Sequence, residues 1–527
     1  MKKRAIFFAL AALVLMQTPS HNQDLWTAAL AKARSIAGIL QESYYKPLEE
    51  EALAIASIRG TLDTLDPHSY FLDPESYSRM REDYTGKYFG VGMQIQKQGD
   101  NIVVISPIEG GPAWRLGILP GDIVSHIDGE STVPLSSYDA MQKLRGEKPG
   151  TKVTITFVRD GVDKPFDLTI IREEIPLSSV PYAFLLDGGV GYIYIRTFGE
   201  DTPRELEAGL AKLTAQGMKS LVLDLRLNTG GALAPSIEIS DLFLPRGALV
   251  VSMKGRNPYY DREFPAYRDN QYEKLPLVIL IDQGTASASE IVSGAVMDHD
   301  RGLVVGEDSW GKGLVQTVFP LAPDMAVALT VAKYLTPSGR SIQRDYSYLD
   351  SYYLAKTAPE ADREVRYTDK GRKVLGQGGI TPDYEVKETI KPLTGRLVLD
   401  GAFFTYARKL VRHQTGLADH YAFPDDMKTG GAVTTAGRVV VDKSFVVDQA
   451  VLNDFRAYAR GLRVEFDDAA FSEAEPEIRH ELEREIYAAL WGAEAGMRAY
   501  RQSDAVVRKA LEVMPEAARF VSGGSGG

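Results

Sequence analysis

The chain contains no cysteine among its 527 residues. This absence excludes disulfides, thiol catalysis and a lipid-modified cysteine. Histidine is also scarce: only seven are present, and none occurs in an H-E-x-x-H pattern or at a comparable ligand spacing. We therefore predict no metal site.

Basic clusters are missing as well. The formal net charge is −11, and no stripe of lysine and arginine runs along the chain. Because nucleic-acid binding requires such a stripe, we predict no nucleic-acid partner. A phosphate-binding loop is also rejected, since Gly313 stands where that motif requires a serine or threonine after its lysine. No nucleotide or other cofactor is predicted.

Long apolar runs are absent except near the N-terminus. There, Lys2, Lys3 and Arg4 precede the apolar run Ala5–Met16, which is too short to span a bilayer. A basic start followed by such a run is typical of an export signal. We predict a signal peptide or N-terminal anchor at residues 1–20, no further transmembrane span, and an exported, periplasmic or otherwise extracytoplasmic protein. An uncleaved segment would hold the protein at the inner membrane.

What the chain does contain is a serine and a lysine in a distinctive setting. Ser287 lies in the small-residue run GTASASE, and Lys312 lies between two glycines. The apolar pattern predicts a strand at Leu275–Ile281, a helix at Ser289–Asp298 and a second strand at Gly302–Gly306. A serine where a strand turns into a helix exposes its hydroxyl near the positive N-terminus of that helix.

A lysine on a neighbouring strand can remove the hydroxyl proton from Ser287, provided that burial keeps the amine of Lys312 neutral. We therefore predict a serine–lysine dyad. Its activity should rise with pH, because free lysine titrates near ~10.4. The alternative is that the small residues serve packing and helix capping and that the lysine is solvated.

The residues around this pair resemble those of a known peptidase family. The segment that begins at Gly284 is similar to the active-site segment of the carboxy-terminal processing peptidases, or tail-specific proteases; it reads GTASASEIVSGAVMDHDRGLVVGEDSWGKGLVQTVFPL. Three further segments resemble motifs of this family: LVLDLRLNTGGAL (Leu221–Leu233), AKYLTPSGRSIQ (Ala332–Gln343) and GGITPDYEV (Gly378–Val386). The likeness extends over about residues 30–390.

The resemblance implies roles for individual residues. Ser287 would be the nucleophile, Lys312 the general base, and Gln316 the side chain that orients the lysine. The spacing of four residues puts Lys312 and Gln316 on one face of an extended segment. Ser289 is the rival nucleophile. The family's spacing from serine to lysine selects Ser287 and leaves Ser289 as a capping or packing residue.

An oxyanion hole requires two backbone N–H groups that point at one place. The residue after the nucleophile, Ala288, can supply one of them. A double-glycine loop can supply the other from Gly230 or Gly231, because glycine allows the backbone to approach closely. Many family members have proline in place of Thr229 and asparagine in place of Leu227, so this loop departs from the family pattern.

A second module precedes the catalytic region. Residues 84–174 show short strands, a small helix and turn signals, and they resemble a PDZ domain of the type inserted in processing peptidases. Such a domain binds an extended peptide beside one strand, and free N–H groups hold the terminal carboxylate. The predicted peptide-binding residues are Phe89, Gly90, Val91, Gly92 and Met93. The alternative is that the two glycines make only a hairpin bend.

The predicted fold class is a multidomain α/β protein. It combines a mixed α/β peptidase core resembling the crotonase–ClpP type, an inserted β-rich PDZ domain, and helical N- and C-terminal regions. The predicted boundaries are 1–20 for the signal or anchor, 24–83 for the N-terminal helical region, 84–174 for the PDZ domain, 175–390 for the peptidase core, 391–521 for the C-terminal helical region and 522–527 for a flexible tail. For the C-terminal region, partner binding, oligomerisation and packing on the core are open, and the apolar stripe favours packing.

These inferences predict a serine endopeptidase. It would recognise the apolar C-terminal tails of exported proteins through its PDZ domain and cleave or degrade them. The alternative is a non-catalytic or latent PDZ scaffold that binds tails and awaits an activating partner. The predicted partners are polypeptide substrates with apolar C-termini; a homodimer or higher oligomer and an activating adaptor protein remain open.

Overall fold

The computed structural model describes residues 21–522 with the exception of 147, 270, 355–358, 388, 425–437 and 463. The predicted signal or anchor at residues 1–20 lies outside the described residues. So does the predicted tail apart from Ser522, which ends a helix. Among the helices of the described residues, none has both the length and the apolar character needed to cross a bilayer.

The chain divides into two compact units. The first contains the residues up to Asp73 together with Gln316–Thr330. The second contains Pro74–Val315 and the residues from Val331 onward. The predicted PDZ domain, most of the predicted peptidase core and the C-terminal helices therefore belong to one unit.

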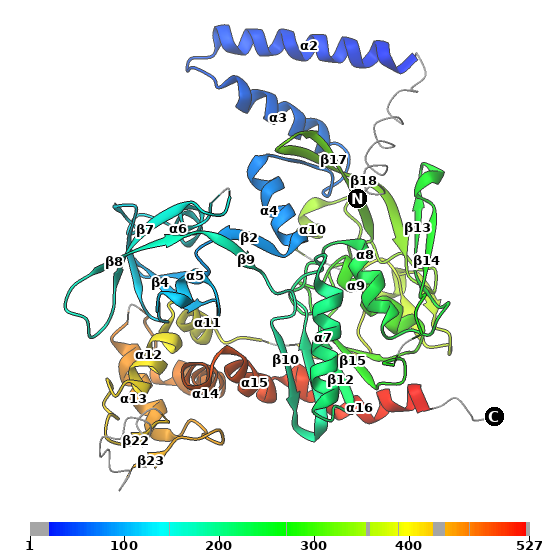
Figure 1. Ribbon diagram of the computed structural model, residues 1–527. Helices are drawn as coiled ribbons and strands as arrows, with labels where there is room; N and C mark the ends of the chain where they lie inside the picture. Colours follow the sequence, from blue (N-terminus) through cyan, green and yellow to red (C-terminus); the bar gives the residue numbers. More distant parts are fainter. Residues whose placement is uncertain are drawn as a thin grey trace. The chain divides into compact units, whose positions relative to one another are not determined.

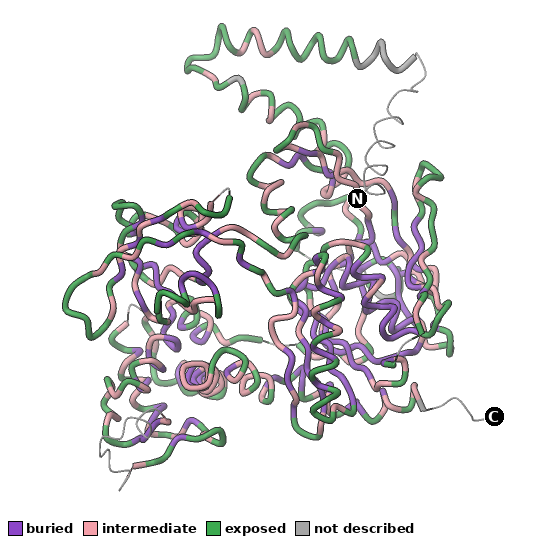
Figure 2. Tube along the Cα trace, viewed as in Figure 1, coloured by how far each residue is buried: buried purple, intermediate pink, exposed green. Residues whose placement is uncertain are grey.

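The first unit begins with two helices (Figure 1). Its elements are α2 (His21–Ser43), α3 (Glu50–Leu62), β1 (Tyr70–Leu72), most of β17 (Leu314–Ala322) and the first part of β18 (Met325–Leu335). β1 pairs antiparallel with β18, where Tyr70 lies opposite Ala328, and β17 also pairs with β18. The residues of α2 described as to burial are mostly exposed, and this helix is largely green in Figure 2.

The second unit begins with α4 (Pro74–Thr85), which leads into the β-rich domain. The elements of this domain are β2 (Lys87–Gly90), β3 (Met93–Gln98), β4 (Asn101–Pro107), α5 (Pro112–Arg115), β5 (Ile123–Ile127), β6 (Glu130–Ser131), α6 (Ser137–Leu144), β7 (Lys152–Val158), β8 (Phe166–Ile171) and β9 (Glu173–Pro176). The sheet order is β3-β4-β5-β7-β8, with β6 beside β5. Along β7, buried Val153, Ile155 and Phe157 alternate with outward-facing residues, the pattern of a sheet that covers a core on one face.

A six-stranded sheet forms the centre of the predicted peptidase core. Its order is β10 (Tyr182–Leu186), β11 (Val190–Tyr194), β12 (Ser220–Asp224), β15 (Leu277–Ile281), β16 (Leu303–Gly306) and β21 (Tyr384–Glu385). β10 pairs antiparallel with β11, and the following four pairings are parallel. All residues of β12 and β15 are buried, as expected for parallel strands covered on both faces.

Helices cover both faces of this sheet. On one face lie α7 (Thr202–Ala215), α8 (Leu233–Asp241) and α9 (Ala288–Asp298), which pack against Leu277, Ile279 and Ile281 of β15. On the other face, Val278 and Leu280 pack against α16 (Ala505–Ser522). Figure 1 shows α16, in red, beneath β12 and β15. One layer of the peptidase core thus comes from the end of the chain, beyond the predicted boundary at residue 390.

The remaining described α-helices and β-strands lie outside the six-stranded sheet. They are β13 (Leu249–Gly255), β14 (Arg262–Pro265), α10 (Leu349–Tyr353), β19 (Val365–Tyr367), β20 (Lys373–Leu375), α11 (Pro392–Leu399), α12 (Ala402–Val411), β22 (Tyr421–Ala422), β23 (Val439–Val440), α13 (Gln449–Arg460), α14 (Asp468–Trp491) and α15 (Ala493–Ser503). Helices α11 to α14 enclose a hydrophobic core of their own. The C-terminal region therefore combines a separate helical core with the layer that α16 adds to the sheet.

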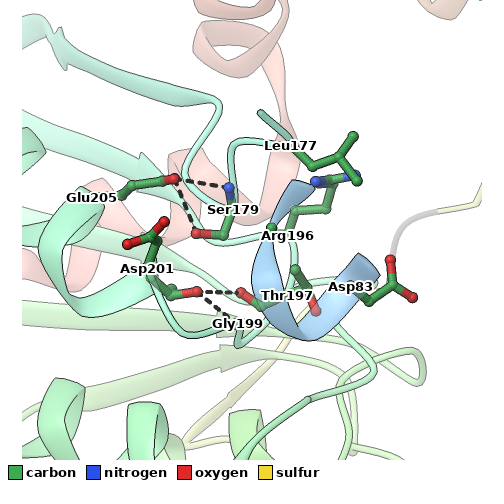
Figure 3. A pocket seen from close by; sticks show the side chains of 10 residues that line it. Asp83, Leu177, Ser179, Arg196, Thr197, Gly199, Asp201 and Glu205 are labelled. Atoms are coloured by element: carbon green, nitrogen blue, oxygen red, sulfur yellow. Dashed lines mark hydrogen bonds between the residues drawn. The ribbon is translucent and has the colours of Figure 1, made fainter. Parts of the chain in front are cut away.

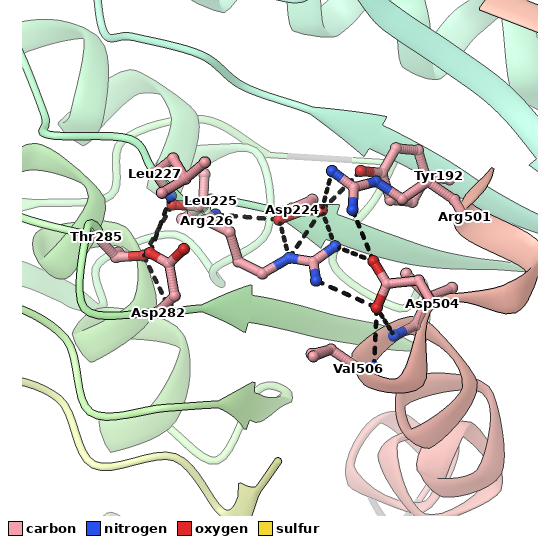
Figure 4. A network of polar contacts seen from close by, with 11 residues as sticks. Tyr192, Asp224, Leu225, Arg226, Leu227, Asp282, Thr285, Arg501, Asp504 and Val506 are labelled. Carbon is pink, nitrogen blue, oxygen red and sulfur yellow. Dashed lines mark hydrogen bonds and ion pairs between the residues drawn. The ribbon is translucent and has the colours of Figure 1, made fainter. Parts of the chain in front are cut away.

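A buried charge network attaches the C-terminal helices to the sheet (Figure 4). Arg226 donates to Asp224 (Nη2–Oδ2, 2.6 Å) and to Asp504 (Nη2–Oδ2, 2.7 Å). Tyr192 also donates to Asp224 (2.6 Å), and Arg501 donates to Asp504 (2.6 Å). Burial alone would raise the pKa of Asp224, but Arg226 and Arg501 lower this pKa to about 2. The carboxylate of Asp224 is therefore ionised at neutral pH.

Candidate active site

Ser287 lies at the turn between β15 and α9. It is the residue directly before the helix, so the strand, turn and helix occur in the order expected from the sequence. Its backbone has φ 55° and ψ −113°, a conformation that is uncommon for a residue with a side chain. Backbone strain of this kind is concentrated at functional turns and persists only where surrounding contacts hold it.

One carboxylate, that of Glu290, brings Ser287 and Lys312 together. Its Oε2 accepts from the backbone N of Ser287 (2.7 Å) and from the backbone N of Lys312 (2.9 Å). Its Oε1 accepts from Gly311 N (2.7 Å) and from the Ser309 hydroxyl (2.5 Å). The fold therefore places the predicted nucleophile and base, which are far apart in sequence, at one buried side chain.

The environment of Glu290 is closed to solvent. The side chain is completely buried in the core of the second unit. Burial raises the pKa of Glu290, and the hydrogen bonds from Ser309, Lys312, Ser287 and Gly311 act in the opposite direction. Each of these bonds stabilises the ionised carboxylate.

Ser289, the rival serine, has a different setting. It is fully buried in α9, and its hydroxyl donates to the backbone carbonyl of Asn228 (3.0 Å). Ser293 in turn donates to the carbonyl of Ser289 (2.9 Å). Ser289 thus joins α9 to the double-glycine loop, whereas Ser287 is only half-buried.

The double-glycine loop lies against Ser287. A Cβ on Gly230 would lie 2.8 Å from Ser287 Cβ and 2.9 Å from Ala288 N, so a side chain does not fit there. The N–H of Gly230 donates to Asn228 Oδ1 (2.9 Å). Within the described part of the chain, the N–H of Gly231 has no hydrogen-bond acceptor. Of the two predicted oxyanion donors in this loop, Gly231 is therefore the one that is not already engaged.

Two anchors fix this loop to the turn before α9 (Figure 4). The N–H groups of Leu227 and Gly284 both donate to Asp282 Oδ1, at 2.9 Å each. The Thr285 hydroxyl donates to the carbonyl of Leu225 (2.9 Å). The loop and the turn that carries Ser287 therefore form one hydrogen-bonded unit.

Leu227 occupies a conformation that suits asparagine better than leucine. Its φ is 58°, in the left-handed region, and 73% of its surface is exposed. Asparagine tolerates this region because its short polar side chain can bond locally. We expect Leu227→Asn to raise the free energy of unfolding by about 1 kcal/mol, since left-handed strain is reduced and little apolar burial is lost.

The midpoint of urea unfolding measures this effect. Leu227→Ala is the matched control, because it removes the same side chain without offering the local hydrogen bond. A midpoint for Leu227→Asn that is no higher than that of Leu227→Ala would contradict the strain argument.

Gln316, the residue predicted to orient the lysine, lies on β17 in the first unit. Its Nε2 donates to Thr330 Oγ1 (3.2 Å), and that hydroxyl donates to Asp66 Oδ1 (3.0 Å). Gln316 therefore belongs to a polar chain within its own unit. Its role toward the base stays a prediction.

The predicted peptide-binding residues lie where β2 passes into β3. Phe89 and Gly90 are the last residues of β2, and Met93 is the first residue of β3. Val91 and Met93 are buried in the core of the β-rich domain. Among the described strands, β3 pairs only with β4, so it lies at the edge of the sheet. Such an edge is where an extended peptide can add as a further strand.

The β-rich domain joins the core at one stretch of chain. The carbonyl of Tyr84 accepts from Glu200 N (2.8 Å), and the carbonyl of Ser179 accepts from Arg196 N (2.8 Å). Figure 3 shows the pocket formed here, in which Glu205 Oε2 accepts from Ser179 N (2.8 Å) and from its hydroxyl (3.0 Å). Both connections of the domain are thus bound to the same segment of the core.

The same segment supports the double-glycine loop. Phe198 N donates to the carbonyl of Gly230 (3.0 Å), and the carbonyl of Phe198 accepts from Ala232 N (2.8 Å). A Cβ on Gly231 would lie 2.3 Å from Phe198 O, so this glycine also has no room for a side chain. The connections of the β-rich domain and the loop beside Ser287 are attached to one short stretch of chain.

Comparison with known proteins decides the family. Residues 189–347 match peptidase family S41, and residues 90–170 match the PDZ domain. The carboxy-terminal-processing protease of Bartonella bacilliformis is 37% identical over 435 residues, which cover 80% of this chain and 96% of that protein. The chain belongs to the carboxy-terminal processing proteases of peptidase family S41.

This processing protease has further relatives. The carboxy-terminal processing protease CtpA of Bacillus subtilis is 32% identical over 352 residues, or 64% of this chain and 74% of that protein. Among solved structures, the PDZ domain of the carboxy-terminal protease from Vibrio cholerae, in complex with peptide, is 28% identical. That similarity covers 17% of this chain and 99% of the other, with a TM-score of 0.16.

The predicted family and the predicted fold class are confirmed. The processing protease is a serine peptidase with a multidomain α/β fold that contains a PDZ domain and helical regions. The sequence reasoning overlooked Glu290 as a site residue. A signal for it was present, because serine followed three residues later by glutamate at a helix start is the pattern of a capping box.

Proposed function

We propose that Ser287 and Lys312 form the catalytic dyad of this processing protease. The observation that carries the proposal is the shared carboxylate: one oxygen of Glu290 accepts from the backbone N of both residues. Ser287 also precedes the first turn of α9, whose dipole favours negative charge that develops on the substrate. Ser289 is not a competitor, because its hydroxyl is buried and bonded to a backbone carbonyl.

This placement supports an acyl-transfer reaction. Ser287 Oγ attacks the carbonyl carbon of the scissile peptide bond while the neutral amine of Lys312 takes the hydroxyl proton. The negatively charged oxygen of the tetrahedral intermediate accepts hydrogen bonds from the N–H groups of Ala288 and Gly231. The C–N bond then breaks, and the proton passes from Lys312 to the leaving amine.

An acyl-enzyme ester on Ser287 remains after this step. Water attacks the carbonyl carbon of the ester while Lys312 takes a proton from the water. The fragment with the new C-terminus then leaves, and the proton passes from Lys312 to Ser287 Oγ, which restores the hydroxyl. For Gln316 we propose the role that the family resemblance implies, which is to orient the amine of Lys312.

We propose that the PDZ domain recruits the substrate by its C-terminal tail. The edge position of β3 supports addition of an extended peptide there. Helix α6 flanks β3, because Lys97 N donates to Ser137 Oγ (2.7 Å). These tails would have apolar ends. They would belong to exported proteins, since the predicted signal at residues 1–20 would direct the protease itself to an extracytoplasmic compartment.

The alternative is a latent or non-catalytic scaffold that captures tails and awaits an activating partner. Such a scaffold would differ from the proposed protease in that it leaves bound substrate intact. The presence of both Ser287 and Lys312 favours the protease.

The test is tail-dependent cleavage of an unfolded protein with an apolar C-terminus. The matched substrate carries a C-terminal amide, which removes the carboxylate and changes nothing else. At substrate concentrations below KM we expect cleavage of the free-acid substrate to be at least about tenfold faster, which corresponds to ~1.4 kcal/mol of binding. Ser287→Ala is the inactive control.

The outcomes distinguish tail recognition, latency and the dyad. Equal cleavage of both substrates would contradict tail recognition while leaving the dyad intact. Binding of the free-acid substrate without cleavage by the parent protein would favour the latent scaffold. Cleavage that persists in the Ser287→Ala protein would contradict the dyad.

A further inference from the structure

Tyr334 contacts both segments of the proposed dyad. It belongs to the family-like segment Ala332–Gln343, for which the proposed reaction has no role. Its hydroxyl donates to the carbonyl oxygen of Ser287 (3.2 Å), and its backbone N donates to the carbonyl of Gly313 (2.9 Å), the residue after Lys312. Only 1% of its surface is exposed, and it lies in the same hydrophobic core as α9. One buried tyrosine therefore bonds the backbone of the proposed nucleophile and the backbone next to the proposed base.

The carbonyl that Tyr334 contacts belongs to the same peptide group as the N–H of Ala288. This group is planar and trans, so its C=O and its N–H point in opposite directions. Because Ala288 is the first residue of α9, its N–H has no acceptor four residues earlier within the helix. A contact that fixes the direction of the Ser287 carbonyl therefore also fixes the direction of the predicted oxyanion donor.

We propose that Tyr334 is a positioning residue for the oxyanion hole. Its hydroxyl holds the peptide group between Ser287 and Ala288 so that the Ala288 N–H points at the negatively charged oxygen of the intermediate. This inference rests on the proposed function of Ser287 and Ala288. Tyr334 acts through that peptide group and not on the substrate, since its hydroxyl is on the carbonyl side, opposite the N–H.

The peptide group requires this support because the backbone of Ser287 is strained. Its ψ of −113° sets the direction of the carbonyl, and strain of this kind persists only where surrounding contacts hold it. The N–H groups of Glu290 (2.9 Å) and Ile291 (3.0 Å) also donate to this carbonyl, but they belong to α9 itself. Of the donors to it within the described residues, only Tyr334 comes from another element. It ties the peptide group to β18, where it lies opposite Met253 of β13.

The Tyr334 hydroxyl keeps its proton at alkaline pH. Burial raises the pKa of Tyr334 well above its usual value, and the negative charge of Glu290 raises this pKa further. A phenol that stays protonated remains a hydrogen-bond donor. The donor is therefore retained as the pH rises toward the range in which the amine of Lys312 is predicted to become neutral.

The decisive variant is Tyr334→Phe, which removes the hydroxyl but keeps the ring and the backbone bond to Gly313. The Ser287 carbonyl keeps its two donors from α9, so no buried group loses its last partner and the variant should fold. Complete loss of an oxyanion donor lowers kcat by about 10²–10³-fold. Here the donor is still present but its direction is less fixed. We therefore expect kcat to fall by about tenfold, with KM changed by less than about threefold.

Inhibition by a peptide aldehyde tests the oxyanion hole directly. Ser287 Oγ adds to the aldehyde carbon, its proton passes to Lys312, and the oxygen of the adduct occupies the place of the oxyanion. We expect the inhibition constant of the aldehyde to be about tenfold higher for Tyr334→Phe, in parallel with the loss of kcat. The pH midpoint of kcat should not change, because the hydroxyl of Tyr334 contacts Ser287 and not the amine of Lys312.

Tyr406→Phe is the matched control. Tyr406 is also completely buried, and its hydroxyl donates to Asp454 (2.8 Å). It belongs to the separate hydrophobic core of α11 to α14. The replacement removes the same atom from a buried hydrogen bond outside the peptidase core. We expect Tyr406→Phe to lower the melting temperature while kcat and the inhibition constant stay within about twofold of the parent values.

The outcomes separate this inference from the proposed function. If the parent protein does not cleave, or if Ser287→Ala cleaves as well as the parent, the dyad itself is wrong. If cleavage depends on Ser287 and Tyr334→Phe keeps the parental kcat, only the positioning role is overturned. A loss of kcat without a matching rise in the inhibition constant would also overturn it, and so would an equal loss of kcat in Tyr406→Phe. A shift of the pH midpoint would overturn it as well, since the tyrosine would then act through Lys312.

A rescue experiment isolates the hydrogen bond from the shape of the side chain. 4-Aminophenylalanine at position 334 places an N–H donor where Tyr334 has its hydroxyl. We expect kcat to return to within about threefold of the parent value. A folded protein with this residue and a kcat as low as that of Tyr334→Phe would overturn the role of the donor.

Discussion

Ser287→Ala is expected to abolish peptide cleavage, with kcat/KM lowered by at least about 10⁴-fold. The alanine has no oxygen to attack the carbonyl, so only uncatalysed attack by water near the oxyanion donors remains. Tail binding by the PDZ domain should persist, since Ser287 lies outside that domain. Initial cleavage rates with the apolar-tailed substrate measure the loss, and binding of the same substrate to the inactive protein measures what is retained.

Lys312→Ala should cause a loss of similar size. In the proposed dyad the nucleophile and the base act as one unit, so the double variant Ser287→Ala/Lys312→Ala should be no worse than either single variant. If the losses of kcat/KM in the two single variants multiply in the double variant, the residues act independently, which would contradict a dyad.

Ser289→Ala serves as the control for the choice of serine. Ser289 contributes a hydrogen bond from α9 to the carbonyl of Asn228, and its loss should lower kcat by about tenfold at most. Full activity of Ser287→Ala together with an inactive Ser289→Ala would reverse the assignment of the nucleophile.

Asp504→Ala is expected to have the largest effect on stability. The Asp504 side chain is completely buried and bonds Arg226 through both oxygens, at 3.2 Å and 2.7 Å. It also accepts from the N–H groups of Val506 (2.9 Å) and Val507 (3.1 Å) at the start of α16. Removing one partner from a buried ion pair costs about 3–5 kcal/mol, because the remaining charge is poorly compensated.

The midpoint of urea unfolding of the peptidase core measures this loss. Asp467→Ala is the matched control. Asp467 caps α14 by accepting from Ala470 N (2.7 Å), but it is exposed and lacks an arginine partner in the described residues. Loss of a cap alone costs about 1 kcal/mol. Equal shifts for the two variants would show that Asp504 acts only as a helix cap and that its buried pair with Arg226 contributes nothing.

Asp504→Asn separates the two contributions further. The asparagine keeps a side-chain oxygen for the start of α16 but removes the charge that faces Arg226 and Arg501. Its midpoint should lie between that of the parent and that of Asp504→Ala. The same network reaches the sheet through Asp224, so the destabilisation should be seen in the core rather than in the separate helical core of α11 to α14.

The sequence by itself determined the family, the fold class and the local structure around the serine. Apolar runs separated by small residues determined the strand, turn and helix that carry Ser287, because such short-range patterns decide local structure. Several motifs at family-like spacing pointed to a processing peptidase with a PDZ domain, and the comparisons agree. Each of these inferences rests on segments whose residues are close together in the sequence.

What only the tertiary structure decided concerns groups that are distant in sequence. The carboxylate of Glu290 meets the backbone of Lys312 only after two parallel strands pair, so no local pattern reveals the contact. The engagement of Gly230 N–H by Asn228 likewise depends on the path of the loop. The apolar stripe of the C-terminal region favoured packing on the core but did not identify the segment or its partner. A hydrophobic face is not directional, and the fold alone brings α16 to the sheet.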